Sequence, residues 1–211
     1  MLIKYSISPK SLYICRMILP IMAYGSPVLR KECEEIAENT NVDSLINDMF
    51  ETMYSSSGVG LAGPQIGKSL RIFIVDASPF AESDDPNEST EEINFLKDFK
   101  KVFINPIIEQ EYGDNWQFSE GCLSIPGVRE DIERSSSIKI SYFDQNWLFH
   151  ESEFDGIAAR IIQHEYDHIE GILFTDHLKP LKRRLLKRKL DDIRKGKVDV
   201  DYRMKFPNYK R

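Results

Sequence analysis

The sequence predicts an α+β fold in which small antiparallel sheets surround a central helix, with outer helices and a C-terminal helix. Apolar residues recur at helical spacing in residues 42–54 and again from about residue 178. The β-rich runs in residues 71–78 and 137–154 are short, which is typical of strands. A mostly apolar segment, residues 155–171, begins with Asp and ends with Gly, and it therefore predicts the buried central helix.

The start of the chain differs from the rest. Residues 1–16 contain no acidic side chain, and they lack the long apolar core and small-residue cleavage site of a secretory signal. Met17 then opens a segment that reads like an ordinary protein start. We therefore expect residues 1–16 to be a disordered or dispensable extension, or the product of an upstream start, with an organelle-targeting peptide as the alternative. Residues 17–211 are expected to form a single domain.

Two helices are expected in the N-terminal quarter. Ser26 followed by Pro27 is a helix-start signal, and this helix is expected to run to about Ala37. The second helix covers residues 42–54, and Asp43 is its expected N-cap.

Strands and one acidic segment make up the middle of the chain. The strand at residues 71–78 is followed by residues 79–100, which are acidic and rich in loop-forming residues. We expect a surface insertion there, because a core segment could not bury so many carboxylates. Residues 101–111 are extended, with an edge strand or a bend at Pro106. The β-rich runs that flank the polar turn in residues 137–154 predict a hairpin.

The last helix is expected from about residue 178. Its apolar face consists of Leu178, Leu181, Leu185, Leu186, Leu190 and Ile193. Its other faces carry the basic residues Lys182, Arg183, Arg184, Lys187, Arg188 and Lys189. A cationic helix on an acidic chain could dock on ribosomal RNA, although a solvated helix face explains the same pattern.

Composition excludes several classes of protein. The net charge of −6 argues against wholesale nucleic-acid binding. The cysteines, Cys15, Cys33 and Cys122, are odd in number and scattered, which argues against a disulfide scaffold and for a reducing compartment. No run approaches the about 20 apolar residues that a membrane span needs. We therefore expect a cytoplasmic globular protein with neither DNA nor membrane as a partner.

The segment QHEYDHIEG, residues 163–171, suggests a metal site within the central helix. His164 and His168 are four residues apart, so a helix presents both imidazoles on one face, where they can reach one ion. Glu165 lies beside them and can hold a water and accept its proton, as in the HExxH pattern. The alternative is a pair of hydrogen-bonded core or surface histidines, because HExxH also occurs by chance.

A third metal ligand is expected upstream of this helix. Downstream, Glu170 and His177 lie close to the helix end, at no familiar third-ligand spacing. Upstream, Cys122 lies in FSEGCLSIPG, residues 118–127, where the glycines and the Pro-Gly pair predict a tight loop. A thiolate with two imidazoles suits Zn²⁺ or Fe²⁺ and leaves a fourth position for water. For Cys122 alone, a small buried hydrophobe is the alternative.

The glycine-rich segment GVGLAGPQIG, residues 58–67, predicts a loop that lies against a ligand. Its glycines permit close approach of the backbone and expose main-chain hydrogen-bonding groups. Gln65 supplies a neutral amide that could donate to an oxyanion. No GK[ST] follows, so the segment is not a P-loop. A plain turn between helix and strand is the alternative.

Together, the segments GVGLAGPQ, EGCLS and QHEYDH resemble, in this order, the signature motifs of the peptide deformylase family. The resemblance runs from about Ile18 to the C-terminal helix and points to the bacterial type 1 branch. It implies a catalytic domain that removes the N-formyl group from the initiator methionine of new polypeptides. The family's metal is often Fe²⁺, with Zn²⁺, Ni²⁺ and Co²⁺ also found. Gly63 in place of the usual Ala, Ile169 in place of the usual Leu and the longer insertion at 79–100 are departures.

The resemblance also implies roles for individual residues. The implied metal ligands are Cys122, His164 and His168. Glu165 would act as general base and then as general acid. The side chain of Gln65 and the backbone N–H of Leu123 would meet the oxyanion, and Gly60 would pair its main chain with the substrate peptide.

Other residues are expected to support this site. The candidates for a pocket that accepts the methionine side chain are Val59, Phe118, Ile157 and Ile161, with plain core residues as the alternative. Glu120 and Arg134 could form a buried ion pair that braces the Cys122 loop, as the resemblance suggests. Asp167 could orient a ligand histidine. For Glu120, Arg134 and Asp167, solvated surface charges are the alternative.

Two other functions remain open on the sequence. One is a zincin-type endopeptidase, which depends on HExxH alone, and Cys122 separates it from the leading hypothesis. The other is a non-enzymatic module that binds the ribosome or the nascent chain and has a structural metal. A required Glu165 argues against that module.

Overall fold

The computed structural model describes residues 17–82 and 89–207. The expected extension at residues 1–16 lies outside them. The strands are β1 (Ile21–Met22), β2 (Gly60–Ala62), β3 (Ile72–Asp76), β4 (Lys100–Cys122), β5 (Ile125–Phe143), β6 (Phe149–Asp155) and β7 (Met204–Lys205). The α-helices are α1 (Asp43–Ser55), α2 (Thr90–Asp98), α3 (Gly156–Ile169) and α4 (Pro180–Arg194), and the short 3-10 helices are Pro27–Arg30, Gly63–Ile66, Ser78–Glu82 and Phe174–Asp176.

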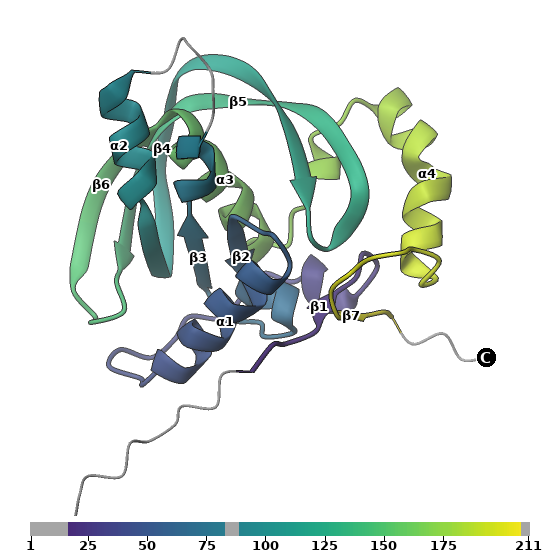
Figure 1. The fold of residues 1–211 in the computed structure, drawn as a ribbon, viewed down its shortest axis with the longest axis horizontal. Coiled ribbons are helices and arrows are strands. Elements are labelled where there is room, and N and C mark those ends of the chain that lie inside the picture. The colour runs from purple at the N-terminus through teal and green to yellow at the C-terminus, as the bar shows by residue number, and fades with distance from the viewer. Residues whose placement is uncertain (1–16, 83–88, 208–211) are drawn as a thin grey trace, which may run out of the picture.

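The predicted α+β class is confirmed. Five strands form one antiparallel sheet in the order β2-β3-β4-β5-β6, while β1 and β7 form a separate parallel pair. The sheet curves around α3, which contacts β2, β3, β5 and β6 (Figure 1). The expected central helix is therefore enclosed largely by one curved sheet.

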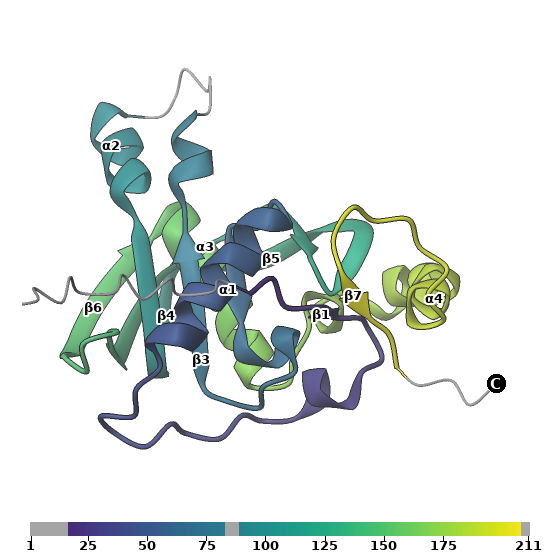
Figure 2. The same ribbon diagram turned by 60° about the horizontal axis from the view of Figure 1, so that its bottom comes forward.

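Helices cover both faces of β3, as its sequence IFIVD requires. Ile72 and Ile74 pack with α1, whereas Phe73 and Val75 pack with α3. Because successive side chains of a strand point to opposite faces, a strand covered on both sides must be apolar throughout. Figure 2 shows α1 and α3 on either side of β3.

β4 and β5 form a long hairpin whose far end carries Cys122. The ladder has register shifts, and one of them spans Pro106, which agrees with the predicted bend. At the other end, Cys122 pairs with Ile125, and only Leu123 and Ser124 form the turn between the strands. The loop expected around Cys122 is therefore mostly strand.

β6 shows the alternation expected of a strand with one buried face. The predicted hairpin of β5 and β6 is confirmed, since Phe143 pairs with Phe149 across its turn.

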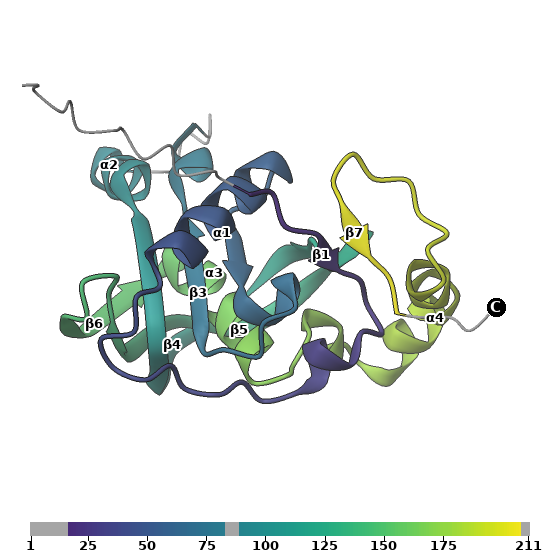
Figure 3. The same cartoon turned by 90° about the horizontal axis from the view of Figure 1, so that it is seen from below.

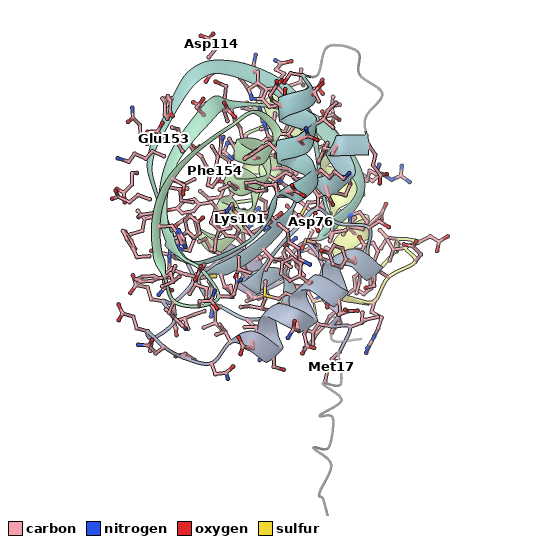
Figure 4. All side chains as sticks on the ribbon, turned by 60° about the vertical axis from the view of Figure 1, so that its left-hand side comes forward. Met17, Asp76, Lys101, Asp114, Glu153 and Phe154 are labelled. Atoms are coloured by element: carbon pink, nitrogen blue, oxygen red, sulfur yellow. The ribbon has the colours of Figure 1, made fainter. Side chains whose placement is uncertain are left out.

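Figure 4 shows the alternation in β6: Phe154 is directed toward the interior and its neighbour Glu153 lies on the outside. In the same view, Asp114 lies at the outer bend of the long β4–β5 hairpin.

Two predictions near the N-terminus are wrong. The helix expected to reach Ala37 is only a 3-10 turn, Pro27–Arg30. Beyond it the backbone bonds to distant segments: the Cys33 N–H donates to the Ile169 carbonyl, and Glu34 bridges Leu70. Asp43 is the first residue of α1 and not its cap, because the Asn41 side chain accepts from the Asp43 N–H.

The acidic segment at residues 79–100 is not a plain loop. It contains α2, where the Ser89 side chain accepts from the Glu92 N–H as an N-cap. Leu96 and Phe99 are buried beneath the helix. Thus the acidic side chains face outward from an amphipathic helix that belongs to the core.

The predicted C-terminal helix is confirmed as α4, but its apolar face is only partly covered. Leu190 and Ile193 are buried, whereas Leu181 and Leu185 are 69% and 75% exposed. Within residues 17–82 and 89–207, no helix combines the length and apolar character that crossing a bilayer requires.

Candidate metal centre

α3 carries both predicted ligand histidines, and the positions of its two ends fix where these histidines lie. It starts directly after β6 and ends at Ile169, just before Gly171, which was predicted to terminate it and whose φ is +72°. A Cβ on Gly171 would lie 2.9 Å from the Arg30 carbonyl carbon, so only glycine fits this close approach. The last turns of the helix therefore hold His164 and His168 at the centre of the molecule.

The expected ligands converge. Ligand atoms of Cys122, His164 and His168 lie within 4.8 Å of one another, and they form the candidate metal-binding group among the described residues. The Cys122 Sγ atom is 3.2 Å from His168 Nε2. Burial alone would raise the pKa of the Cys122 thiol, but the imidazoles of His168 and His164 lower it to about 5. A ready thiolate beside two imidazoles fits Zn²⁺ or Fe²⁺.

Glu120 orients His164. Its carboxylate lies 2.9 Å from His164 Nδ1, which leaves Nε2 of this imidazole for an ion. Arg134 donates to the same carboxylate at 2.8 and 3.1 Å, and Arg160 donates at 2.9 Å. Burial opposes ionisation of Glu120, but His164 and Arg134 hold its pKa well below the usual range. The expected Glu120–Arg134 pair is thus part of a larger buried network.

The other polar residues near the helix end have partners of their own. Asp167 bonds to Arg134 at 2.8 Å and to His177 at 2.7 Å, so it orients no candidate ligand. Glu170 pairs with Arg71 at 2.6 Å. The downstream residues that a zincin reading would use are therefore engaged elsewhere.

Glu165 is buried beside the ligands. Burial raises the pKa of its carboxyl to about 7, against the opposing effect of His164 and His168. Its Oε2 atom has no hydrogen-bond partner within the described part of the chain. A Cβ at Gly60 would lie 2.7 Å from Glu165 Cδ, so glycine is needed where β2 passes this carboxylate.

The glycine-rich segment orients Gln65. The Ala62 N–H donates to Gln65 Oε1 at 2.7 Å, which fixes the amide. Its Nε2 atom consequently faces Cys122 Sγ at 3.6 Å. This buried side chain directs an N–H toward the same centre as the histidines.

A cavity of about 730 Å³ adjoins these residues. Of the pocket candidates, Val59, Phe118 and Ile161 line the cavity. Ile157, in the first turn of α3, does not line it and packs against the core. The cavity's lining residues also include Phe80, Arg160 and Tyr202, which the sequence analysis did not identify. A signal existed for Arg160, because it interrupts an otherwise apolar run in α3 and a buried guanidinium needs a carboxylate.

Fold and site together place the chain among the metal-dependent hydrolases. The family model described as Polypeptide deformylase matches residues 18–184. The chain belongs to this family, and the predicted resemblance is confirmed.

Relatives of known family align with this chain over nearly their whole length. The peptide deformylases of Christiangramia forsetii and Flavobacterium psychrophilum are 54% and 55% identical over 196 residues, which cover 92% of this chain and 99% and 100% of theirs. The crystal structure of a peptide deformylase from Legionella pneumophila is 36% identical with a TM-score of 0.70, covering 86% of this chain and 98% of its own. That from Thermus thermophilus is 34% identical with a TM-score of 0.72, covering 85% and 99%.

Proposed function

We propose that this chain hydrolyses the N-formyl group of N-formylmethionyl peptides and releases formate. In this proposal Cys122, His164 and His168 hold one divalent ion, and Glu165 moves the proton. The convergence of one thiol and two imidazoles beside a buried carboxylate carries the proposal. A zincin-type peptidase or a non-enzymatic module is not favoured, because the family match and the engaged Glu170 and His177 support neither.

Glu165 is suited to transfer a proton at neutral pH. A divalent ion held beside it supplies Lewis acidity, which makes a water acidic enough to ionise near neutral pH. Glu165 accepts the proton of the attacking water and then gives it to the departing amine nitrogen. Burial raises the pKa of this carboxyl above its usual value, which favours a group that can both accept a proton and return it.

Two donors stabilise the negative charge that develops on the formyl oxygen. One is Gln65 Nε2, which the Ala62 N–H orients through the other end of the amide. The other is the backbone N–H of Leu123, at the turn that follows Cys122. Losing one such donor typically costs about 100- to 1,000-fold in rate.

The substrate lies along β2. Within the described chain β2 pairs with β3 alone, and its other edge can pair with an extended peptide through Gly60. The methionine side chain enters the cavity between Val59, Phe118 and Ile161. Since the formyl carbon carries only hydrogen, the narrow space at Gly60 and Glu165 excludes larger acyl groups.

The ion in the cell is proposed to be Fe²⁺, with Zn²⁺, Ni²⁺ or Co²⁺ able to replace it, since the same donors suit these ions. A reducing bacterial cytoplasm, as the scattered cysteines suggest, would protect both Fe²⁺ and the Cys122 thiolate. Anaerobic purification followed by metal analysis identifies the ion.

A brief contact of α4 with ribosomal RNA is a further part of the proposal. Arg184, Lys187 and Arg188 are exposed and make no hydrogen bond or ion pair to the described residues. Replacing all three by Ser should weaken salt-sensitive co-sedimentation with ribosomes and leave peptide deformylation unchanged. Unaltered co-sedimentation would exclude α4 as the contact.

The central test is formate release from formyl-Met-Ala-Ser. Glu165→Ala should retain the metal and lose at least about 100-fold in rate, because the proton carrier is gone. Cys122→Ser should lose metal as well as activity. Undiminished turnover by Glu165→Ala, or full metal binding by Cys122→Ser, would contradict the assigned roles.

A further inference from the structure

The turn that follows Cys122 accepts hydrogen bonds from two residues far away in the sequence, one in the N-terminal and one in the C-terminal part of the chain. Leu123 and Ser124 form this turn between β4 and β5. The Ser124 carbonyl accepts from the Tyr24 N–H at 2.8 Å, and the Leu123 carbonyl accepts from the Tyr202 hydroxyl at 2.8 Å. Neither bond belongs to the hairpin's own ladder, so the turn depends on distant residues for its orientation.

Tyr202 reaches the turn because the chain reverses after α4. Figure 3 shows the segment from α4 looping back to β7, which lies beside β1. Met204 pairs with Ile21, and the Ile21 N–H donates to the Arg203 carbonyl at 2.9 Å. Tyr202 also packs against the core cluster that includes Leu61 of β2, and it lines the cavity. Its ring is thus fixed on several sides.

This returning segment lies beyond the part of the chain that the family model matches, which ends at residue 184. Even so, residues 199–202 contribute to the wall of the cavity that holds the candidate metal centre. The cavity beside the candidate metal centre is therefore completed by residues outside the stretch that the family model matches.

We propose that Tyr202 is a positioning residue for deformylation. Its hydroxyl fixes the Leu123–Ser124 turn, and thereby aims the Leu123 N–H at the developing oxyanion. The inference rests on the proposed role of Leu123. Without the hydroxyl, the Leu123 carbonyl has no other side-chain donor among residues 17–82 and 89–207, and the turn can rotate and carry its N–H away from the aligned position.

The test compares Tyr202→Phe with Tyr54→Phe. Each variant loses one hydroxyl and keeps its ring; the Tyr54 hydroxyl donates to Asp76 and does not line the cavity. For formyl-Met-Ala-Ser, Tyr202→Phe should lower kcat about 3- to 30-fold, less than complete loss of a donor, because the N–H is displaced and not removed. KM should change less than about twofold, since the interaction strengthens in the transition state. Tyr54→Phe should keep its kcat.

Two measurements separate positioning from simple damage to the fold. Rates are normalised to bound metal, and amide hydrogen exchange of residues 121–125 is measured on the metal-loaded protein. Exchange should be several-fold faster in Tyr202→Phe, while the parent and Tyr54→Phe exchange alike. A kcat per bound metal equal to that of the parent, or unchanged exchange of the turn, would overturn the proposal.

Glu165→Ala in the same assay tells the two failures apart. If Glu165→Ala is inactive and Tyr202→Phe has the parental kcat, the role of Tyr202 is refuted and the proposed function stands. If Glu165→Ala is active, the proposed mechanism itself fails.

Discussion

Charged side chains gather in two regions of the molecule, around Glu120 and along α4. The Glu120 carboxylate and the guanidinium groups of Arg134 and Arg160 are at most 5% exposed, and every one of them is paired. On α4, by contrast, Arg184, Lys187 and Arg188 are exposed.

The comparison shows that the contribution of a charged pair to the free energy of unfolding depends on its burial, and not on how many charges lie nearby. Exposed pairs contribute about 0–1 kcal/mol, because water and salt screen them. Breaking a buried pair costs about 3–5 kcal/mol, because the remaining partner is left uncompensated. The network around Glu120 should therefore be sensitive to substitution, and the surface of α4 should tolerate it.

The largest effect is expected at Glu120, which three groups share. Glu120→Gln should lower the free energy of unfolding by about 3–5 kcal/mol, because Arg160 stays buried without its anion and Arg134 keeps only Asp167. It should also weaken zinc binding about 10- to 100-fold, as losing the partner of a ligand imidazole usually does. Urea unfolding and competition with a chelator measure both.

Glu130→Gln provides the matched control on the same hairpin. Glu130 pairs with Lys182 at the surface, at 3.1 Å. Its replacement should change stability by less than about 1 kcal/mol and leave zinc affinity unaltered. Equal losses in the two variants would refute the contrast between the regions.

Arg160→Met should have the next largest effect. Arg134 still compensates Glu120 in this variant, so the expected loss is about 1–3 kcal/mol, close to that of hydrogen bonds to charged groups. The Trp116 and Ile132 carbonyls also lose a donor, since Arg160 bonds them at 2.7 and 3.0 Å. Arg188→Met on α4 should be neutral in the same urea titration. A loss as large as that of Glu120→Gln would mean that Arg134 does not compensate.

The separation of two residues along the chain decides how much of the site the sequence could predict. His164 and His168 are four residues apart, so helix geometry alone predicts that they share a face, with Glu165 beside them. Arg160 and Glu120 are 40 positions apart, and Tyr202 and Leu123 are 79 apart. Such pairs depend on how the long hairpin and the returning C-terminal segment fold, and no local pattern in the sequence encodes them.

The fold follows the same rule. α1, α3 and α4 were predictable because each has its own apolar periodicity. The segment after Pro27 has a helix-start signal, yet its backbone bonds to Ile169 and Ser69, so tertiary contacts decide against a helix. In residues 79–100 the many carboxylates led to the prediction of a surface insertion. The burial of Leu96 shows instead that α2 packs against the core.

Asp76 is an intermediate case, since it is buried beside the Tyr54 and Ser78 hydroxyl groups and has no ion pair with a described residue. Burial opposes its ionisation, but hydrogen bonds from Ser78 and Tyr54 lower the pKa of Asp76 below its usual value. The contribution to stability is therefore complete above the unfolded pKa of about 3.9 and is lost as the pH falls through the folded pKa.

Asp76→Asn should accordingly destabilise the protein by about 1–2 kcal/mol at pH 7 and by much less near pH 3. Urea unfolding at both values measures the difference. Asp43→Asn, at the exposed start of α1, should change stability by less than about 0.5 kcal/mol at either pH. A loss for Asp76→Asn that does not shrink in acid would show that packing, and not charge, is responsible.

The smallest effect is expected at Leu185 on α4. The sequence places Leu185 on the same apolar stripe as Leu190, but Leu185 is 75% exposed and Leu190 is 4% exposed. The core beneath α4 covers only the C-terminal part of the helix, through Leu190 and Ile193. Leu185→Ser should therefore shift the free energy of unfolding by no more than about 0.5 kcal/mol and leave kcat unchanged. Leu185→Ala serves as the control for helix propensity, and a loss above about 1 kcal/mol in both variants would mean that this part of α4 is covered in solution.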